Sequence, residues 1–125
     1  MRYIVDSCVW IDFMSGKKHF DAMTALLNDN LAFTNKIILA ELLPSAKIRK
    51  ENDFIECISG IEIVPLEIDW DEITEMQFNC LKSGINKIGL LDIVILQNVK
   101  QNKMGIFSTD KHIIALANLL NVQLL

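Results

Sequence analysis

The stretch YIVDSCVWID, residues 3–12, places a carboxylate directly after a short apolar run. The letters YIV predict a short buried strand, and Ser7 is a favourable N-cap for the amphipathic segment that follows. Two roles for Asp6 are open at this point: it ends the strand and helps to cap the next helix, or it is a ligand at a functional site. The rest of the chain is needed to choose between them.

The composition is that of a globular domain. The hydrophobic fraction is 51% and the charged fraction 22%, which excludes a disordered chain. With 125 residues the chain is long enough for a full hydrophobic core, and we expect a single domain spanning residues 1–125. No apolar run is long and charge-free enough to cross a bilayer, and the first strand begins too close to Met1 for a signal peptide. We therefore expect a cytoplasmic protein with no membrane partner.

The cysteines and the net charge narrow the class of site. Cys8, Cys57 and Cys80 are odd in number, widely spaced and set within apolar patterns. This favours buried, reduced thiols, and the absence of CxxC or Cys/His pairs argues against a zinc site. The formal net charge of -4 does not by itself support binding to nucleic acid.

Short strand-like segments alternate with helical ones along the whole chain. The predicted strands are residues 2–6, 31–34, 61–66, 105–108 and 122–125. The predicted helices are residues 7–14, 19–29, 35–50, 53–59, 69–84, 90–102 and 110–120. Asn35 opens the third helix, Pro44 either kinks it or starts a new one, and Pro65 confines the third strand to an edge or terminates it. The alternation predicts an α/β fold with a mostly parallel sheet and helices on both faces.

Polar residues follow two of the predicted strands. In parallel α/β sheets, ligand chemistry gathers beyond the carboxyl ends of the strands. Asp6 ends the first strand, and Ser108, Thr109 and Asp110 come just past the apolar letters GIF. This rule makes these residues candidates for one shared site.

Two further acids lie in strongly apolar helical runs. Glu41 is found in IILAELL and Asp92 in GLLDIVIL, where an ionised carboxylate is costly to bury without a partner. Neither has an obvious Lys or Arg at i,i+4 spacing. Asp92 has an alternative role as a first-turn acid that the helix macrodipole favours. Several carboxylates near the carboxyl edge of a sheet suit a hard cation, Mg²⁺ or Mn²⁺.

Four motifs follow one another along the chain: DSCVWID after the first strand, AEL in the third helical region, GLLDIVI before a helix, and STDKH near the C-terminus. Together they resemble the PIN-domain family, and the VapC-like toxins of toxin–antitoxin pairs are the most similar subgroup. The resemblance covers the whole chain in length, motif order and motif spacing. It implies a PIN-like three-layer α/β/α sandwich and metal-dependent endonucleolytic cleavage of RNA.

The resemblance also implies roles for individual residues. A quartet of carboxylates would be catalytic and would hold Mg²⁺ or Mn²⁺: Asp6, Glu41, Asp92 and Asp110. The three aspartates would be direct ligands, with Glu41 either ligating or orienting the attacking water. Ser108 matches the hydroxyl residue two positions before the last acid. Ser7 matches the small polar residue after the first acid, where it holds a water or only caps the helix.

Some residues depart from the family pattern. Pro44 falls where the family helix usually continues, and Leu96 and Gln97 replace small residues after the third acid. Asp12 is a helical turn or more from Asp6, and we expect it at the surface or behind the ligands rather than among them.

Other conspicuous side chains have structural explanations. His19 shows no acid–base partner. His112, two residues after Asp110, has two open roles, a contact with RNA or a place on the helix surface or in packing, and we expect the second. Trp10 and Trp70 lie at helical apolar spacing and are expected in the core or at an interface. Phosphate contacts away from the metal would fall to basic residues, none of which is assigned individually: Lys17, Lys18, Lys47, Arg49, Lys50, Lys82 and Lys87.

Three partners follow from the resemblance: an RNA substrate, a cognate antitoxin, and a second copy in a homodimer, for which apolar residues around Trp10 or Phe13 could serve. The antitoxin would direct Arg or Lys into the quartet and lay an apolar helix between the first helices and helix 35–50. Two alternatives remain, a PIN nuclease of RNA processing or decay and a catalytically inert PIN-like binding module. The inert module typically lacks one or more of the acids, all of which are present here.

Overall fold

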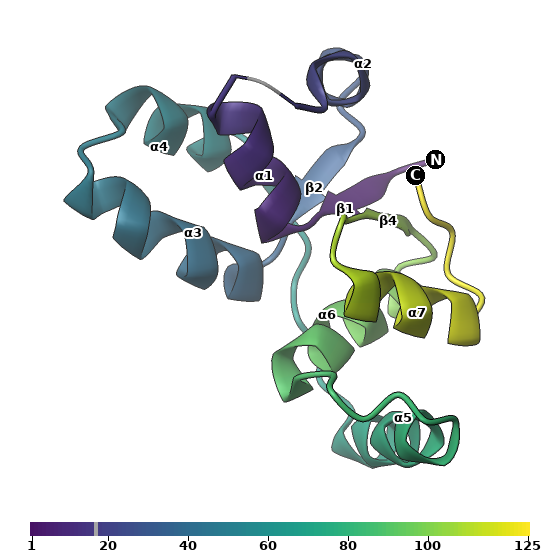
Figure 1. Cartoon of the computed structure of the whole chain (residues 1–125). Coiled ribbons are helices and arrows are strands. Elements are labelled where there is room, and N and C mark those ends of the chain that lie inside the picture. Colours follow the sequence, from purple (N-terminus) through teal and green to yellow (C-terminus); the bar gives the residue numbers. More distant parts are fainter. Residues whose placement is uncertain (17) are drawn as a thin grey trace.

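The computed structural model describes residues 1–16 and 18–125 and contains a parallel sheet flanked by helices (Figure 1). Four strands form the sheet in the order β3-β2-β1-β4, with every neighbouring pair parallel. They are β1 (Tyr3–Val5), β2 (Ala32–Thr34), β3 (Glu62–Ile63) and β4 (Gly105–Phe107). Lys17, one of the predicted phosphate-binding residues, lies outside the described residues.

Helices cover the sheet on both faces. Those in the described residues are α1 (Ser7–Met14), α2 (Phe20–Asn28), α3 (Lys36–Ile48), α4 (Asn52–Ser59), α5 (Trp70–Lys82), α6 (Leu90–Gln101) and α7 (Lys111–Leu119). Figure 1 shows α1, α3 and α4 on one side and α5, α6 and α7 on the other. The predicted three-layer α/β/α fold with a parallel sheet is confirmed. Across the described ranges, the structure has no helix with the length and apolar character needed to cross a membrane.

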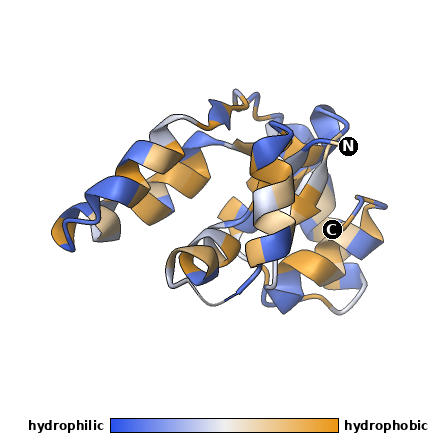
Figure 2. Cartoon of the chain, turned by 90° about the horizontal axis from the view of Figure 1, so that it is seen from above, coloured by the Kyte–Doolittle hydropathy of each residue, from blue (hydrophilic) through white to orange (hydrophobic). Residues whose placement is uncertain are grey.

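The core is built around β1 and α6. Ile4 and Val5 of β1 are fully buried, and α6 is buried continuously from Ile93 to Val99. Figure 2 shows hydrophobic residues on the strands and on one face of most helices. Because α6 is enclosed by neighbours along most of its length, the acid near its start is carried on a firmly packed element.

The parallel register brings several strand ends to one edge of the sheet. β1 pairs with β2 and with β4, and all three strands end at the same level. The residues that follow them are Asp6, Asn35 and Ser108. The Asp6 N–H donates to the carbonyl oxygen of Phe107 at 2.9 Å, so the pairing extends one step past β1.

Buried amides hold α3 against α6. Asn35 opens α3 as predicted, because its Oδ1 accepts from the Ile38 N–H at 3.0 Å. Its Nδ2 donates to Asn98 Oδ1 of α6 at 3.1 Å, and Asn98 Nδ2 donates to the Pro65 carbonyl oxygen at 2.9 Å. These bonds tie together the two helices that carry the predicted acids Glu41 and Asp92.

The side chains after the third acid also have structural roles. Leu96 is fully buried, and Gln97 is 1% exposed. Gln97 Nε2 donates to the carbonyl oxygen of Asp69 at 3.0 Å and to Glu72 Oε1 at 2.8 Å. Gln97 therefore anchors the first turn of α5 on α6.

Two predictions of local structure were only partly right. The helix α3 runs unbroken through Pro44, so no new helix starts there. The predicted strand 122–125 is reduced to a single bridge between Ile106 and Leu124. Since α7 continues to Leu119 and the chain turns at Asn121 with a φ of 57°, few residues remain to pair with β4.

The expected burial of all three cysteines was also wrong. Cys80 is buried and Cys8 half-buried, but Cys57 is exposed, and all three are free thiols. The short helix α4 turns Phe54 and Ile58 toward the core. Cys57 adjoins Ile58 in the chain and therefore points elsewhere.

The two tryptophans have opposite environments. Trp10 is fully buried and packs against Phe54 and Phe13, with ring centroids 6.4 and 6.5 Å away. Trp70 is 59% exposed, because α5 buries Ile73 instead. Trp10 is therefore a core residue, one of its two expected roles, and a dimer interface formed by the apolar residues around it or Phe13 stays a prediction.

Candidate active site

Asp6 lies at the end of β1 and caps α1. One carboxylate oxygen accepts from the Ser7 N–H at 2.8 Å, and the other accepts from the Ser108 hydroxyl at 2.7 Å. The N-cap is therefore Asp6, and Ser7, which was expected to be the cap, is the first residue of the helix. Asp6 is 6% exposed. Its structural role as a cap is confirmed, and its role as a metal ligand stays a prediction.

Ser108 connects the first and the last of the four acids. Its Oγ donates to Asp6 and accepts from the N–H of Asp110 at 3.0 Å. Asp110 in turn caps α7, because its Oδ1 accepts from the N–H groups of His112 and Ile113 at 2.8 and 3.1 Å. One hydroxyl thus sets the relative position of two acids that are far apart in the sequence.

Asp92 is the third residue of α6, whose N-cap is Gly89. The Gly89 backbone favours the ionised Asp92 carboxylate and lowers its pKa, against larger effects that raise it. Asp92 Oδ2 lies 3.6 Å from where a Cβ at Gly89 would be. The carboxylate is thereby held at the helix start, where the backbone N–H groups favour negative charge.

The four acids interact electrostatically. Desolvation raises the pKa of Glu41, and the charges of Asp6 and Asp92 raise it further. Desolvation likewise raises the pKa of Asp92, followed by the charges of Asp110 and Asp6. Asp6 is therefore within electrostatic reach of Glu41 and Asp92, and Asp110 is within reach of Asp92, so four separate segments bring carboxylates to this part of the molecule.

The donor set suits a hard divalent cation, although the carboxylates do not yet converge on one point. Within residues 1–16 and 18–125, no three His, Cys, Asp or Glu side chains lie close enough together to form a ready-made ligand set. The four acids offer only oxygen donors, which Mg²⁺ and Mn²⁺ prefer. In the same described ranges, no Lys or Arg forms an ion pair with any of them. Their mutual repulsion is therefore not offset by a Lys or Arg partner, and a bound cation would relieve it.

The expectation that apolar neighbours bury Glu41 and Asp92 was wrong. Glu41 is exposed, and Asp92 is only half-buried. The reason lies in the orientation of the helix: α3 turns Ile38 and Leu42 toward the core, which leaves Glu41 on a side that is open to solvent.

His19 has an acid partner that the sequence pattern did not reveal. Its Nε2 lies 3.2 Å from Asp12 Oδ2, and its ring packs edge-on against Phe107 with centroids 5.4 Å apart. No local spacing signals this pair, because α1 ends at Met14 and His19 adopts a left-handed φ of 63°. Asp12 thus fastens the connection between α1 and α2.

Cys8 is a second neighbour of the site that sequence reasoning missed. Its Sγ lies 3.6 Å from both Asp6 Oδ2 and Ser108 Oγ, and the Thr109 hydroxyl donates to it at 3.4 Å. The only signal in the sequence was its position two residues after the first acid.

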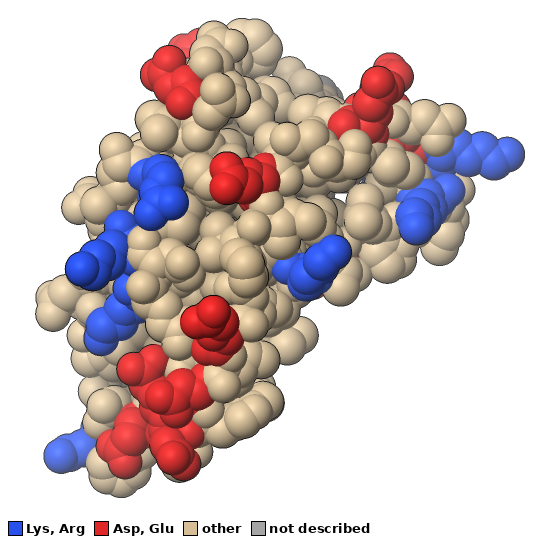
Figure 3. All heavy atoms as spheres, turned by 180° about the vertical axis from the view of Figure 1, so that it is seen from behind, with Lys and Arg blue, Asp and Glu red and all other residues tan. Residues whose placement is uncertain are grey.

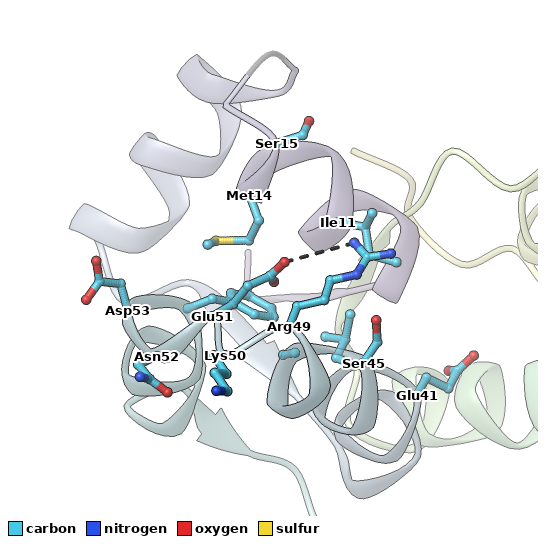
Figure 4. A pocket seen from close by; sticks show the side chains of 13 residues that line it. Ile11, Met14, Ser15, Glu41, Ser45, Arg49, Lys50, Glu51, Asn52 and Asp53 are labelled. Atoms are coloured by element: carbon cyan, nitrogen blue, oxygen red, sulfur yellow. Dashed lines mark ion pairs between the residues drawn. The ribbon is translucent and has the colours of Figure 1, made fainter.

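An open groove leads away from Glu41 between α1, α3 and α4. It encloses about 690 Å³, and Figure 4 shows Glu41 at one end and Asp53 at the other. Arg49 lies along it with Nη1 4.0 Å from Glu51 Oε1. The apolar part of its lining consists of Ile11, Met14, Leu42, Ala46 and Phe54. The groove lies where an antitoxin helix was predicted to bind, and its occupant stays a prediction.

Comparison with known proteins identifies the family. The model of the PIN domain family matches residues 3–119. The chain belongs to the PIN-domain family. A solved structure described as a toxin-antitoxin complex from Klebsiella pneumoniae is similar to this PIN domain with a TM-score of 0.62. The two chains are 20% identical, and the similarity covers 86% of each, so it supports the fold alone. No curated protein matches the chain.

Acidic residues outside the candidate site of this PIN domain gather at α5. Figure 3 shows a dense acidic cluster at the end of the molecule where α5 lies, with basic side chains along another edge. Asp71 and Glu72 occupy the first turn of α5, and Asp69 caps it. The net charge of -4 thus includes acids outside the quartet, and it does not describe the surface beside the quartet.

Proposed function

We propose that residues 1–125 form a single PIN nuclease domain that hydrolyses RNA with Mg²⁺ or Mn²⁺ held by the acid quartet. The observation that carries the proposal is that two acids after strands, Asp6 and Asp110, raise the pKa of acids on two helices: Asp6 acts on Glu41 and Asp92, and Asp110 acts on Asp92. In the alternative, each acid has only a structural role, as a helix cap or a surface residue. That alternative does not require the four acids to lie at the same edge of the sheet.

In this proposal the acids hold the metal ion and Ser108 positions two of them. A divalent ion bound there would activate water and offset negative charge on the leaving oxygen. Asp6, Asp92 and Asp110 would hold the ion, and Glu41 would either ligate it or orient the water. Ser108 keeps Asp6 and Asp110 in place through its two hydrogen bonds, as second-layer contacts do for metal ligands in general.

The first prediction is metal-dependent ribonuclease activity. Purified protein should cleave RNA with Mg²⁺ or Mn²⁺ and lose that activity in EDTA. Asp6→Asn or Asp92→Asn should abolish cleavage while circular dichroism shows an intact fold, because each removes an anionic ligand without changing volume. Asp71→Asn is the matched control, since it removes a first-turn acid of α5 away from the quartet. Cleavage that survives EDTA would contradict the proposal.

We further propose that the nuclease is the toxin of a toxin–antitoxin pair and works as a homodimer. The solved relative is described as such a complex, and the groove beside Glu41 offers apolar walls next to an acidic site. An antitoxin helix would fill the groove with apolar side chains and present Arg to the quartet, whose carboxylates match its planar fork. An RNA-processing nuclease or an inert binding module would need no such inhibitor.

The second prediction concerns restraint by a partner. Expression alone should arrest growth, and coexpression with the adjacent gene should restore it. Met14→Glu places a charge on the groove wall, so arrest should persist and rescue should fail. Leu119→Glu, on a similarly exposed apolar residue of α7, should leave rescue intact. If wild type and Asp6→Asn are equally harmless or equally toxic, the toxin assignment is wrong.

A further inference from the structure

His112 lies beside the quartet, and its ring makes no hydrogen bond among the described residues. It is the second residue of α7, and its backbone N–H donates to Asp110 Oδ1 at 2.8 Å. The ring Nδ1 lies 3.7 Å from the same oxygen, which is longer than a hydrogen bond. Within the part of the chain that the structure describes, neither ring nitrogen of His112 makes a hydrogen bond.

The same ring is also near an acid from another helix. His112 lowers the pKa of Asp92, opposing the larger effects of desolvation and of the neighbouring acids. The imidazole is therefore 3.7 Å from the carboxylate that caps α7 and within electrostatic reach of Asp92 on α6. Its side chain is 35% exposed, so solvent or a ligand can reach it.

The acids supply hydrogen-bond acceptors, and two hydroxyl donors beside them are already engaged. Ionised carboxylates only accept hydrogen bonds. The Ser108 hydroxyl already donates to Asp6, and the Thr109 hydroxyl already donates to Cys8. The phosphate oxygens of RNA are acceptors too, and the acids repel their charge. An imidazole carries one ring N–H when neutral and two when protonated, so His112 can donate in either state.

We propose that His112 binds the RNA next to the quartet by donating a ring N–H to a phosphate oxygen. The proposal rests on the proposed nuclease function for its substrate. It makes His112 a substrate-contacting residue, separate from the metal ligands. An N–H donor here would fix the backbone of the RNA beside the acids, as phosphate contacts position nucleic acids on proteins in general.

Binding and cleavage test the contact separately. In an Asp6→Asn background, a fluorescently labelled RNA oligonucleotide should bind His112→Phe at least about tenfold more weakly than the parent, because a donor to a charged acceptor is lost. His112→Gln keeps an N–H donor and should recover much of the affinity. With Asp6 intact, His112→Phe should raise KM more than it lowers kcat. The Mg²⁺-induced rise in Tm should stay unchanged.

Lys111→Gln is the matched control, since it removes a positive charge from the same turn of α7 and should change affinity by less than about threefold. Equal binding by His112→Phe and the parent would overturn the contact, as would equal losses in His112→Phe and Lys111→Gln. Loss of the Mg²⁺ response in His112→Phe would place His112 in the metal site and also overturn it. If RNA binding depends on His112 but the protein with Asp6 intact does not cleave RNA, the contact is supported and the nuclease assignment is overturned. No RNA binding by the parent would overturn both.

Discussion

The raised pKa of Asp92 links the charge of the candidate site to the stability of the fold. Desolvation and the charges of Asp110 and Asp6 raise its pKa in the folded protein. The folded state therefore holds the proton more tightly than the unfolded chain. Stability from this group is complete below the unfolded pKa, about 3.9, and is lost as pH rises through the higher folded value. At neutral pH, ionised Asp92 destabilises the metal-free protein.

The third prediction is that Asp92→Asn raises Tm in EDTA at pH 7, because a neutral amide is not repelled by the other acids. The gain should shrink as pH falls, because Asp92, whose pKa is raised in the folded protein, then takes up a proton and loses its charge. Millimolar Mg²⁺ should raise the Tm of wild type by ligand linkage and raise that of Asp92→Asn much less. Differential scanning fluorimetry measures both effects.

Asp71→Asn is again the control, since Asp71 also lies in the first turn of a helix. Losing its favourable interaction with the helix dipole should lower Tm slightly or leave it unchanged. A wild-type melting curve that Mg²⁺ leaves unmoved would show that the clustering of carboxylates does not create a cation site.

Pairs of elements, more than single helices, determine where the acids lie. Glu41 and Asp92 belong to α3 and α6, which meet through the buried amides of Asn35 and Asn98. Each amide also makes a second bond, to the Ile38 N–H and to the Pro65 carbonyl oxygen. A buried network of this kind is stabilising only when every member is satisfied. The relative position of the two acids therefore depends on groups outside the site.

The fourth prediction is that Asn98→Leu destabilises the fold, because it removes the partner of the Asn35 Nδ2 donor and the side-chain donor to the Pro65 carbonyl oxygen. Each buried group left unsatisfied costs about 1–3 kcal/mol. Urea denaturation should show this loss, whereas Asn118→Leu on the exposed side of α7 should stay within about 0.5 kcal/mol of wild type. The Mg²⁺-induced rise in Tm should also fall in Asn98→Leu alone. An Asn98→Leu protein as stable as wild type would refute the role of the network.

On the scale of the whole molecule, an exposed apolar strip on α5 is the surface through which we propose that a second copy binds. Trp70, Phe78 and Leu81 lie along one side of α5 and are 59%, 58% and 63% exposed. A two-fold axis across α5 would pack these side chains against their equivalents. It would also set the acidic first turn of one copy beside the Lys82 end of the other, with the helix dipoles antiparallel.

The fifth prediction is that the proposed homodimer forms through α5. Phe78→Glu should convert dimers to monomers in sedimentation velocity, because a charge would be buried in an apolar contact. Phe20→Glu, on a phenylalanine of α2 that is 65% exposed, is the matched control and should remain dimeric. A wild-type protein that is monomeric at high concentration, or a dimer split only by Phe20→Glu, would contradict this interface.

Local patterns in the sequence were sufficient for the fold class and for the candidate acids. Alternation of strand and helix periods predicts the parallel α/β sheet, because each period determines which residues can be buried together. The rule that sites form at strand ends then selects Asp6 and Asp110 from the sequence alone. Asn35 and Asp69 were likewise readable as helix caps, since capping depends on neighbours within four residues.

Only the tertiary structure decided how these parts meet. The bridge from Ser108 to Asp6, the amide pair between α3 and α6, and the Asp12–His19 contact all join segments whose spacing in the sequence carries no signal. The same holds for exposure: a helix pattern shows which face is apolar, but the elements packed on it decide whether Trp10 is buried and Trp70 is not. Burial and side-chain contacts are properties of the packed chain, because they depend on neighbours that local sequence does not contain.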